Sequence, residues 1–167
     1  MSAKRPLSAE EKAIAAWQLD VPGFGEEGQQ RLKSARVLVS RCGGVGGAVA
    51  YQLAAAGVGT LRLAHAGNIR LDDLNRQLLM THAGLGRPRM DLAPQRLREL
   101  NPYVQVEAVA ENVSEENVDR LVEGVDVVVS CAPLFPERLA LNRAAVRKKI
   151  PLIDCAMYEL ELQLLTV

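Results

Sequence analysis

The 167-residue sequence has few cysteines, few aromatic residues and no excess of either charge. Its three cysteines, Cys42, Cys131 and Cys155, are too few and too widely spaced for a disulfide scaffold or a C-x-x-C metal or redox motif. Twenty basic residues balance twenty acidic ones, so no net field favours a nucleic acid or an anionic membrane. We therefore expect a reducing, cytoplasmic setting, with neither nucleic acid nor membrane as a partner.

Long apolar runs are also lacking. No run approaches the roughly 20 residues that a membrane-spanning helix needs, and the first residues, MSAKRPLSAEEKA, lack the apolar core of a signal peptide. What is present is the composition of a globular domain, with 49% hydrophobic and 24% charged residues. A chain of this length is expected to form one domain with a sizeable core.

Short apolar runs alternate with helical segments from residue 35 onward. Strands buried on both faces are expected wherever such a run is bounded by turn residues, at 35–40, 60–64, 104–110, 125–132 and 151–155. Helices are expected between them, at 48–56, 87–100 and 136–149, with a short one after Ser114. This alternation predicts a doubly wound, Rossmann-like α/β sheet, mostly parallel, with strand order 3-2-1-4-5 and ligands at the carboxyl ends of the strands.

The two ends of the sequence depart from this pattern. Residues 1–30 are predicted to form a helical arm, in which Ser8 caps a helix and Glu11 completes a capping box, and residues 31–167 to form the Rossmann-like domain. The segment 158–165 alternates polar and apolar side chains, which predicts a half-buried strand near a sheet edge. An apolar edge in that place predicts a partner that covers it.

A glycine-rich loop, RCGGVGG (41–47), lies between the first expected strand and the helix that follows. This is the context of a nucleotide-binding fingerprint, because glycines let the backbone approach phosphate groups at a helix N-terminus. Gly43 and Gly46 match the G-x-G-x-x-G pattern, whereas Arg41 stands at its first position. Arg41 is expected either to occupy the pyrophosphate site or to pair with a phosphate. Tight packing between strand and helix is the competing explanation for the glycines.

The second expected strand ends in His65, where a dinucleotide site has an acidic residue for the ribose hydroxyls. Histidine can bind a hydroxyl, but less well than a carboxylate, and an ordinary histidine at a strand end is the competing interpretation. The missing acid argues against an NAD(P)-dependent oxidoreductase and against tight ATP binding.

The stretch LNRQLL (74–79) resembles the ThiF/MoeB/HesA branch of the ubiquitin-activating enzyme superfamily. The similarity continues in register through its neighbours GEEGQQRL (25–32), AAAGVGTLRL (54–63), GLGRPR (84–89) and RLRELNPYVQVEAV (96–109). It covers about residues 17–157. The resemblance implies a homodimer or heterodimer that uses Mg-ATP to adenylate the C-terminal glycine of a ubiquitin-like or sulfur-carrier protein.

The resemblance also implies roles for individual residues. Asn75, Arg76 and Gln77 match the family's ATP-facing N-R-Q, with Arg76 as the phosphate-binding cation and the best catalytic candidate. The family's glycine loop falls on Gly43, Gly44 and Gly46.

The sequence departs from the family pattern at positions that bind ATP or magnesium in the family. His65 replaces a ribose-binding aspartate, Pro133 the magnesium-binding aspartate, Arg89 a phosphate-contacting lysine, and Trp17 an arginine that reaches the partner's ATP. We therefore expect weak ATP binding, a compromised magnesium site and a degenerate copy that serves as a non-catalytic partner or binding scaffold. The alternative is an active adenylyltransferase completed by a partner chain or by the family's C-terminal part. That part, with its zinc site, is not expected within these residues, so no zinc is predicted.

The three cysteines lie at the ends of the first, fourth and fifth expected strands. If these strands adjoin, the sulfurs approach each other, as in a thiol or soft-metal site. We favour the simpler interpretation of three small buried apolar residues, because no C-x-x-C or nearby histidine supports a metal.

Overall fold

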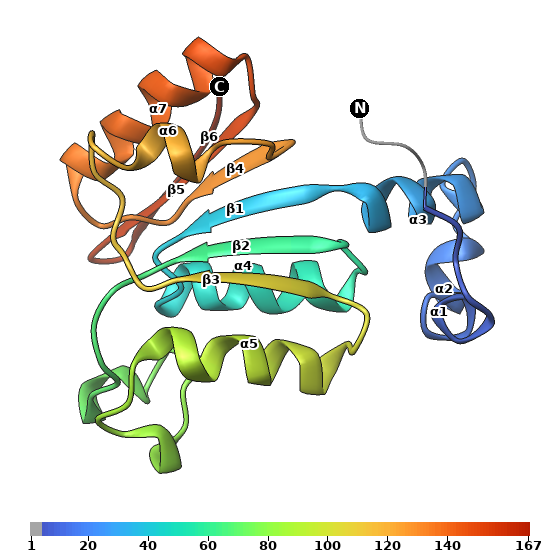
Figure 1. Cartoon of the computed structure of the whole chain (residues 1–167), viewed down its shortest axis with the longest axis horizontal. Coiled ribbons are helices and arrows are strands. Elements are labelled where there is room, and N and C mark those ends of the chain that lie inside the picture. The colour runs from blue at the N-terminus through green and yellow to red at the C-terminus, as the bar shows by residue number, and fades with distance from the viewer. Residues whose placement is uncertain (1–4) are drawn as a thin grey trace.

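Six strands form one sheet in the computed structural model, which describes residues 5–167 (Figure 1). Their order is β3-β2-β1-β4-β5-β6; the first five are parallel, and β6 runs antiparallel to β5. The strands are β1 (Arg36–Ser40), β2 (Thr60–Ala64), β3 (Gln105–Val109), β4 (Val127–Ser130), β5 (Leu152–Tyr158) and β6 (Glu161–Thr166). The doubly wound sheet and the strand order predicted for its parallel part are confirmed.

Helices cover both faces of this sheet, which explains why its central strands are apolar throughout. Val37 and Val39 of β1 belong to the core beneath α4 (Gly44–Ala55) and α5 (Arg89–Leu100). Leu38, between them, belongs to the opposite core, with α6 (Val118–Leu121) and α7 (Phe135–Lys148). The alternation follows from the two-residue period of a strand. In the described residues no helix is long and apolar enough to cross a membrane.

The glycine run forms the first turn of α4. That helix begins at Gly44, with Gly43 as its N-cap, rather than at residue 48 as the sequence pattern predicted. Glycine is a poor helix former, so the run favours a turn by propensity alone. Packing against the end of β1 overrides this propensity, and the free N–H groups of the helix therefore belong to the loop itself.

The N-terminal arm contains α1 (Ala9–Ile14) and α2 (Ala16–Leu19) and leads into α3 (Gly25–Ser34). The Ser8–Glu11 capping box of α1 is confirmed in both directions, with N···O distances of 2.7 and 3.1 Å. The arm lies beyond the amino end of β1, far from the strands' carboxyl ends (Figure 1), and Trp17 of α2 is 88% exposed there. The predicted division at residue 30 falls inside α3 and stays a prediction.

The last two strands form a hairpin at the sheet edge. All six residues of β6 are exposed, so the prediction of a half-buried strand is wrong for the described chain. Alternation sets Leu162 and Leu164 on one face, but β6 pairs only with β5 and lies at the end of the sheet order. The hairpin therefore leaves large apolar side chains in solvent, among them Leu160, Leu162 and Leu164.

Candidate functional site

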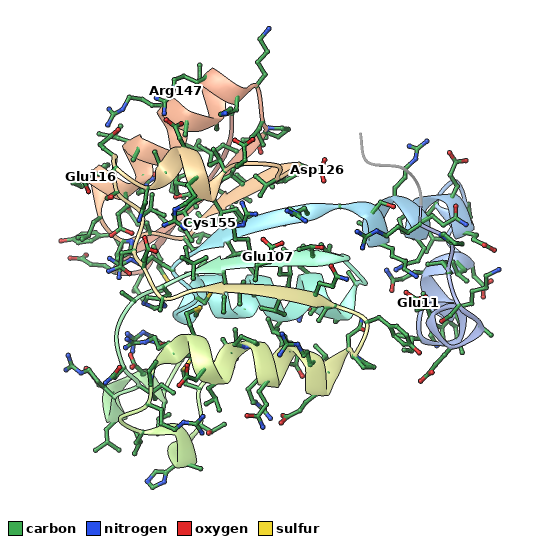
Figure 2. All side chains as sticks on the ribbon, viewed as in Figure 1. Glu11, Glu107, Glu116, Asp126, Arg147 and Cys155 are labelled. Atoms are coloured by element: carbon green, nitrogen blue, oxygen red, sulfur yellow. The ribbon has the colours of Figure 1, made fainter. Side chains whose placement is uncertain are left out.

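A cleft of about 770 Å³ opens at the carboxyl ends of the central strands. It is lined by the glycine loop, by part of the connection between β2 and α5, by the residues after β4, and by the β5–β6 hairpin. Cys155, which lines it from β5, is labelled in Figure 2. The volume is in the range of small-molecule and cofactor sites. The place is the one where doubly wound sheets bind ligands, because strand order reverses between β1 and β4.

The glycines of the loop meet two different neighbours. A Cβ added to Gly46 would lie 2.3 Å from the carbonyl oxygen of Arg41, so this glycine permits close packing of α4 against the end of β1. A Cβ added to Gly44 would lie 3.2 Å from Cγ of Arg76. At Gly43 the nearest neighbours would be the side chains of Gln77 and His65, at 3.7 and 3.8 Å. Packing therefore explains Gly46. Gly43 and Gly44 lie instead against polar side chains, namely those of Gln77, His65 and Arg76.

Arg76 is the exposed cation of the site. Its Nη1 donates to the carbonyl oxygen of Asp72 at 2.6 Å and to Oδ1 of Asn75 at 3.0 Å, which are neutral acceptors. Within residues 5–167 its guanidinium makes no ion pair, so its charge is available to an anion. Asn75 itself is exposed and orients Arg76 from outside the cleft.

Arg41 is the second cation, and it is held more firmly. Its φ of 61° lies in the left-handed region, and its side chain turns toward the first turn of α7. Both its Nε and its Nη2 donate to the carboxylate of Glu137, the former at 2.8 Å. The side chains of Arg41 and Glu137 are 19% and 7% exposed, so this two-pronged ion pair is largely shielded from water. The burial of Glu137 could not be expected from its local sequence, in which it is one charged residue in the first turn of a helix.

Arg89 does not line the cleft but supports the segment that does. It is buried and donates through Nη2 to Asp73 at 2.5 Å. The same carboxylate accepts from Nε2 of Gln77 and from the backbone N–H of Arg70 at 2.9 Å. Asp73 thus ties the connection between β2 and α5 into one unit and holds Gln77 beside Gly43. No sequence signal distinguishes Asp73 from its neighbour Asp72.

His65 lies at the end of β2 with its ring against the glycine loop. Burial, followed by the positive charges of Arg89 and Arg41, lowers the pKa of His65 to about 4. The imidazole is therefore neutral at pH 7. Its Nδ1 is buried without a partner in the described chain, although His65 lines the cleft. A buried polar atom normally has a partner, so this nitrogen is available to a hydroxyl of a bound ligand.

We expect the shifted pKa of His65 to make the fold acid-sensitive. Between pH 6.5 and about 4 the unfolded chain protonates this imidazole and the folded chain does not, so stability falls as pH falls through that window. The difference between the two pKa values corresponds to a loss on the order of 3 kcal/mol in the free energy of unfolding. Urea unfolding across this pH range should show a clearly flatter pH dependence in His65→Gln. His82→Gln, which changes the other, exposed histidine, should keep the wild-type profile; parallel profiles for wild type and His65→Gln would contradict the assignment.

The carboxylates around the cleft do not form a magnesium clamp. Magnesium takes oxygen ligands, usually from one or two carboxylates together with phosphate and water. Pro133 supplies none, and Glu137 and Asp154 are bound by Arg41 and Arg138. Of the lining residues only Glu161 is acidic, and it lies on the exposed strand β6. No group of three histidine, cysteine or acidic side chains in the described residues could hold a metal ion.

The three cysteines share one side of the sheet, as the strand order predicted. Cys42 and Cys131 belong to the core beneath α4, and Cys155 packs against it. Cys131 and Cys155 lie on adjacent strands, directly after the residues Ser130 and Asp154 that are paired in register. Burial raises the pKa of Cys131 to about 12 and also raises that of Cys155. All three are free thiols, so they resemble small apolar residues more than nucleophiles at pH 7.

Comparison with known proteins agrees with this geometry. The ThiF family model matches residues 16–167. Protein HesA, vegetative, of Trichormus variabilis is 49% identical over 150 residues, which are 90% of this chain and 57% of that protein. The sulfur carrier protein ThiS adenylyltransferase of Escherichia coli is 38% identical over 130 residues, 78% of this chain and 52% of that protein. The chain therefore spans about half the length of these curated relatives.

A solved structure with a bound nucleotide has the same fold. The crystal structure of E. coli tRNA N6-threonylcarbamoyladenosine dehydratase in complex with ATP aligns with a TM-score of 0.82 at 26% identity. The alignment covers 88% of this chain and 60% of that one.

Proposed function

The chain belongs to the ThiF family, and from that premise we propose that it binds ATP in the cleft between the glycine loop and Arg76. The observation that carries this proposal is the position of Arg76, whose side-chain stem lies against Gly44 at the N-terminus of α4 and whose guanidinium makes no ion pair within residues 5–167. Free backbone N–H groups, the positive end of the helix dipole and the residue Arg76 therefore line the same cleft. Together they favour a phosphate group. The ATP complex of a structural relative supports this assignment.

The remaining polar groups fit a nucleoside. His65 places an unpartnered Nδ1 at the end of β2, where doubly wound folds bind ribose. One neutral nitrogen replaces the two oxygens of a carboxylate, so we expect the ribose to be held weakly. Phe135 and Tyr158 add exposed aromatic surface at the opposite rim.

We infer that this chain does not adenylate a carrier protein by itself. Adenylation requires the charge on the triphosphate to be neutralised while the α-phosphate is attacked. The side chain of Pro133 has no oxygen to offer a metal ion, and the buried carboxylates of Glu137 and Asp154 are bound to Arg41 and Arg138. The chain would serve as a nucleotide-binding partner or scaffold in a reaction on a ubiquitin-like or sulfur-carrier protein.

Isothermal titration calorimetry with ATP tests the binding proposal. We expect weak binding by the wild type and a loss of roughly 10- to 150-fold in affinity for Arg76→Ala, because one charge-assisted phosphate contact contributes roughly 1.5–3 kcal/mol. Arg70→Ala is the matched control, since Arg70 lies in the same connection but is exposed and paired with Asp72. Equal affinity of Arg76→Ala and wild type, or no ATP binding by the wild type, would refute the proposal.

A working adenylyltransferase is the second candidate. It is favoured by the adenylyltransferases among the relatives and by the fact that the chain spans about half their length. A partner chain, or sequence outside these residues, would then supply the missing groups. ATP–pyrophosphate exchange with a carrier protein decides between the candidates. Exchange above the carrier-free background supports the enzyme, and bound ATP without exchange supports the scaffold.

The exposed hairpin supports a partner subunit in either case. Five large apolar side chains are exposed along the hairpin of β5 and β6, at an edge of the kind that proteins usually cover: Met157, Tyr158, Leu160, Leu162 and Leu164. A related subunit, forming a homodimer or heterodimer, would cover it. A cytoplasmic location stays part of this proposal.

A further inference from the structure

We propose that Arg41, held by Glu137, takes the place of a divalent cation at the glycine loop, so that the cleft binds the polyphosphate of ATP without magnesium. The inference rests on the proposed nucleotide binding and adds the cationic side chain that contacts the polyphosphate in place of a metal ion. It requires that Arg41 be fixed in place, that part of its guanidinium remain available, and that no better cation site be present.

Arg41 is fixed by geometry and by charge. Its backbone is in the left-handed region, and Nε and Nη2 both contact the carboxylate of Glu137. Glu137 lies in the first turn of α7, where the helix dipole stabilises its negative charge. A pair with two contacts and little exposure holds an arginine side chain far better than a surface ion pair does. The cation is therefore already in place before a ligand binds.

Part of the guanidinium remains available. Arginine has five N–H donors in one plane, and Glu137 occupies the Nε edge and one hydrogen of Nη2. Arg41 lines the cleft, whereas Glu137 lies behind it and is not among the lining residues. Arg41 and Arg76 therefore both line the cleft beside the glycine loop, whereas Glu137 does not.

Few carboxylate oxygens near the cleft are free to bind a competing magnesium ion. Glu137, the buried acid nearest to Pro133 in sequence, is already neutralised by Arg41. A metal ion there would have to displace the guanidinium or draw its ligands from Glu161 on the exposed hairpin. The Arg41–Glu137 pair has no net charge, so it neutralises less than a magnesium ion would. Binding is therefore expected to be weak but independent of magnesium.

The test is calorimetry of ATP binding to the full chain in EDTA and in millimolar magnesium. We expect dissociation constants that agree within about twofold. The double variant Arg41→Gly/Glu137→Gln removes the pair without leaving a buried charge, and glycine accepts the left-handed backbone at residue 41 without strain. It should lose about tenfold or more in affinity in EDTA. Glu137→Gln alone, which keeps the cation, should lose less than the double variant.

The outcomes separate the inference from the proposed function. Binding that needs magnesium would overturn the inference and leave the nucleotide site intact. Wild-type affinity of the double variant in EDTA, with its fold confirmed by circular dichroism, would also overturn it. Absence of ATP binding in both buffers would overturn the proposed function, and the inference with it.

Discussion

Replacing Asp73 by alanine is expected to lower the free energy of unfolding by about 3–5 kcal/mol, because the buried guanidinium of Arg89 then has no counter-charge. The side chains of Asp73 and Arg89 are only 6% and 11% exposed, so water cannot replace the lost partner without local opening. Gln77 and the backbone N–H of Arg70 lose the same acceptor. The connection that carries Arg76 should therefore loosen, and ATP affinity should fall together with stability.

Asp72→Ala is the matched control for Asp73→Ala. Asp72 is the adjacent acid, and its ion pair with Arg70 is exposed on both sides. Such pairs contribute little, so we expect a change in unfolding free energy within about 0.5 kcal/mol. Urea denaturation of both variants measures the difference. If the two substitutions destabilise the chain equally, Asp73 is not the organising carboxylate of this segment.

Gly46→Ala is expected to lower the free energy of unfolding by about 1–3 kcal/mol and to weaken ATP binding severely. The new Cβ would lie 2.3 Å from the backbone oxygen of Arg41 and 3.2 Å from Cβ of Cys131, so α4 must move away from β1. That movement displaces the helix N-terminus from the cleft and shifts Arg41 away from Glu137. The higher helix propensity of alanine stabilises α4 but does not restore the position of its N-terminus. We therefore still expect ATP affinity to fall.

Gly47→Ala provides the control one residue further along the same helix. Its Cβ would meet nothing closer than the carbonyl oxygen of Cys42 at 3.5 Å, which is ordinary contact. Alanine favours a helix over glycine by up to about 1 kcal/mol, so this variant should be as stable as wild type or more so. Thermal unfolding and ATP titration of the pair decide the matter. Comparable behaviour of the two variants would contradict the tight packing ascribed to Gly46.

The sheet could be predicted from sequence because its central strands are buried on both faces. That burial makes segments such as 60–64 short and continuously apolar, and β2 occupies these residues in the structure. The capping box could be predicted for a different reason, because Ser8 and Glu11 are three residues apart and form their hydrogen bonds within one helical turn. The start of α4 was not, because packing against β1 outweighs the low helix propensity of its glycines.

The candidate site could be predicted only where its residues are close in sequence. The glycine loop and Arg76 were identified by local pattern and by resemblance, and the cleft brings them together. The pair of Arg41 with Glu137 joins residues 96 positions apart, and Asp73 with Arg89 depends on how a long connection folds back. The local sequences around Glu137 and Asp73 therefore do not predict that either carboxylate is buried and paired with a guanidinium.

A crystal structure of the chain with ATP would show directly whether the cleft is the nucleotide site. We expect the phosphates to lie against Gly43 and Gly44 at the start of α4, with the guanidinium of Arg76 in contact with them and the ribose near His65. A cleft that stays empty at saturating ATP, or ATP bound elsewhere on the chain, would contradict this expectation.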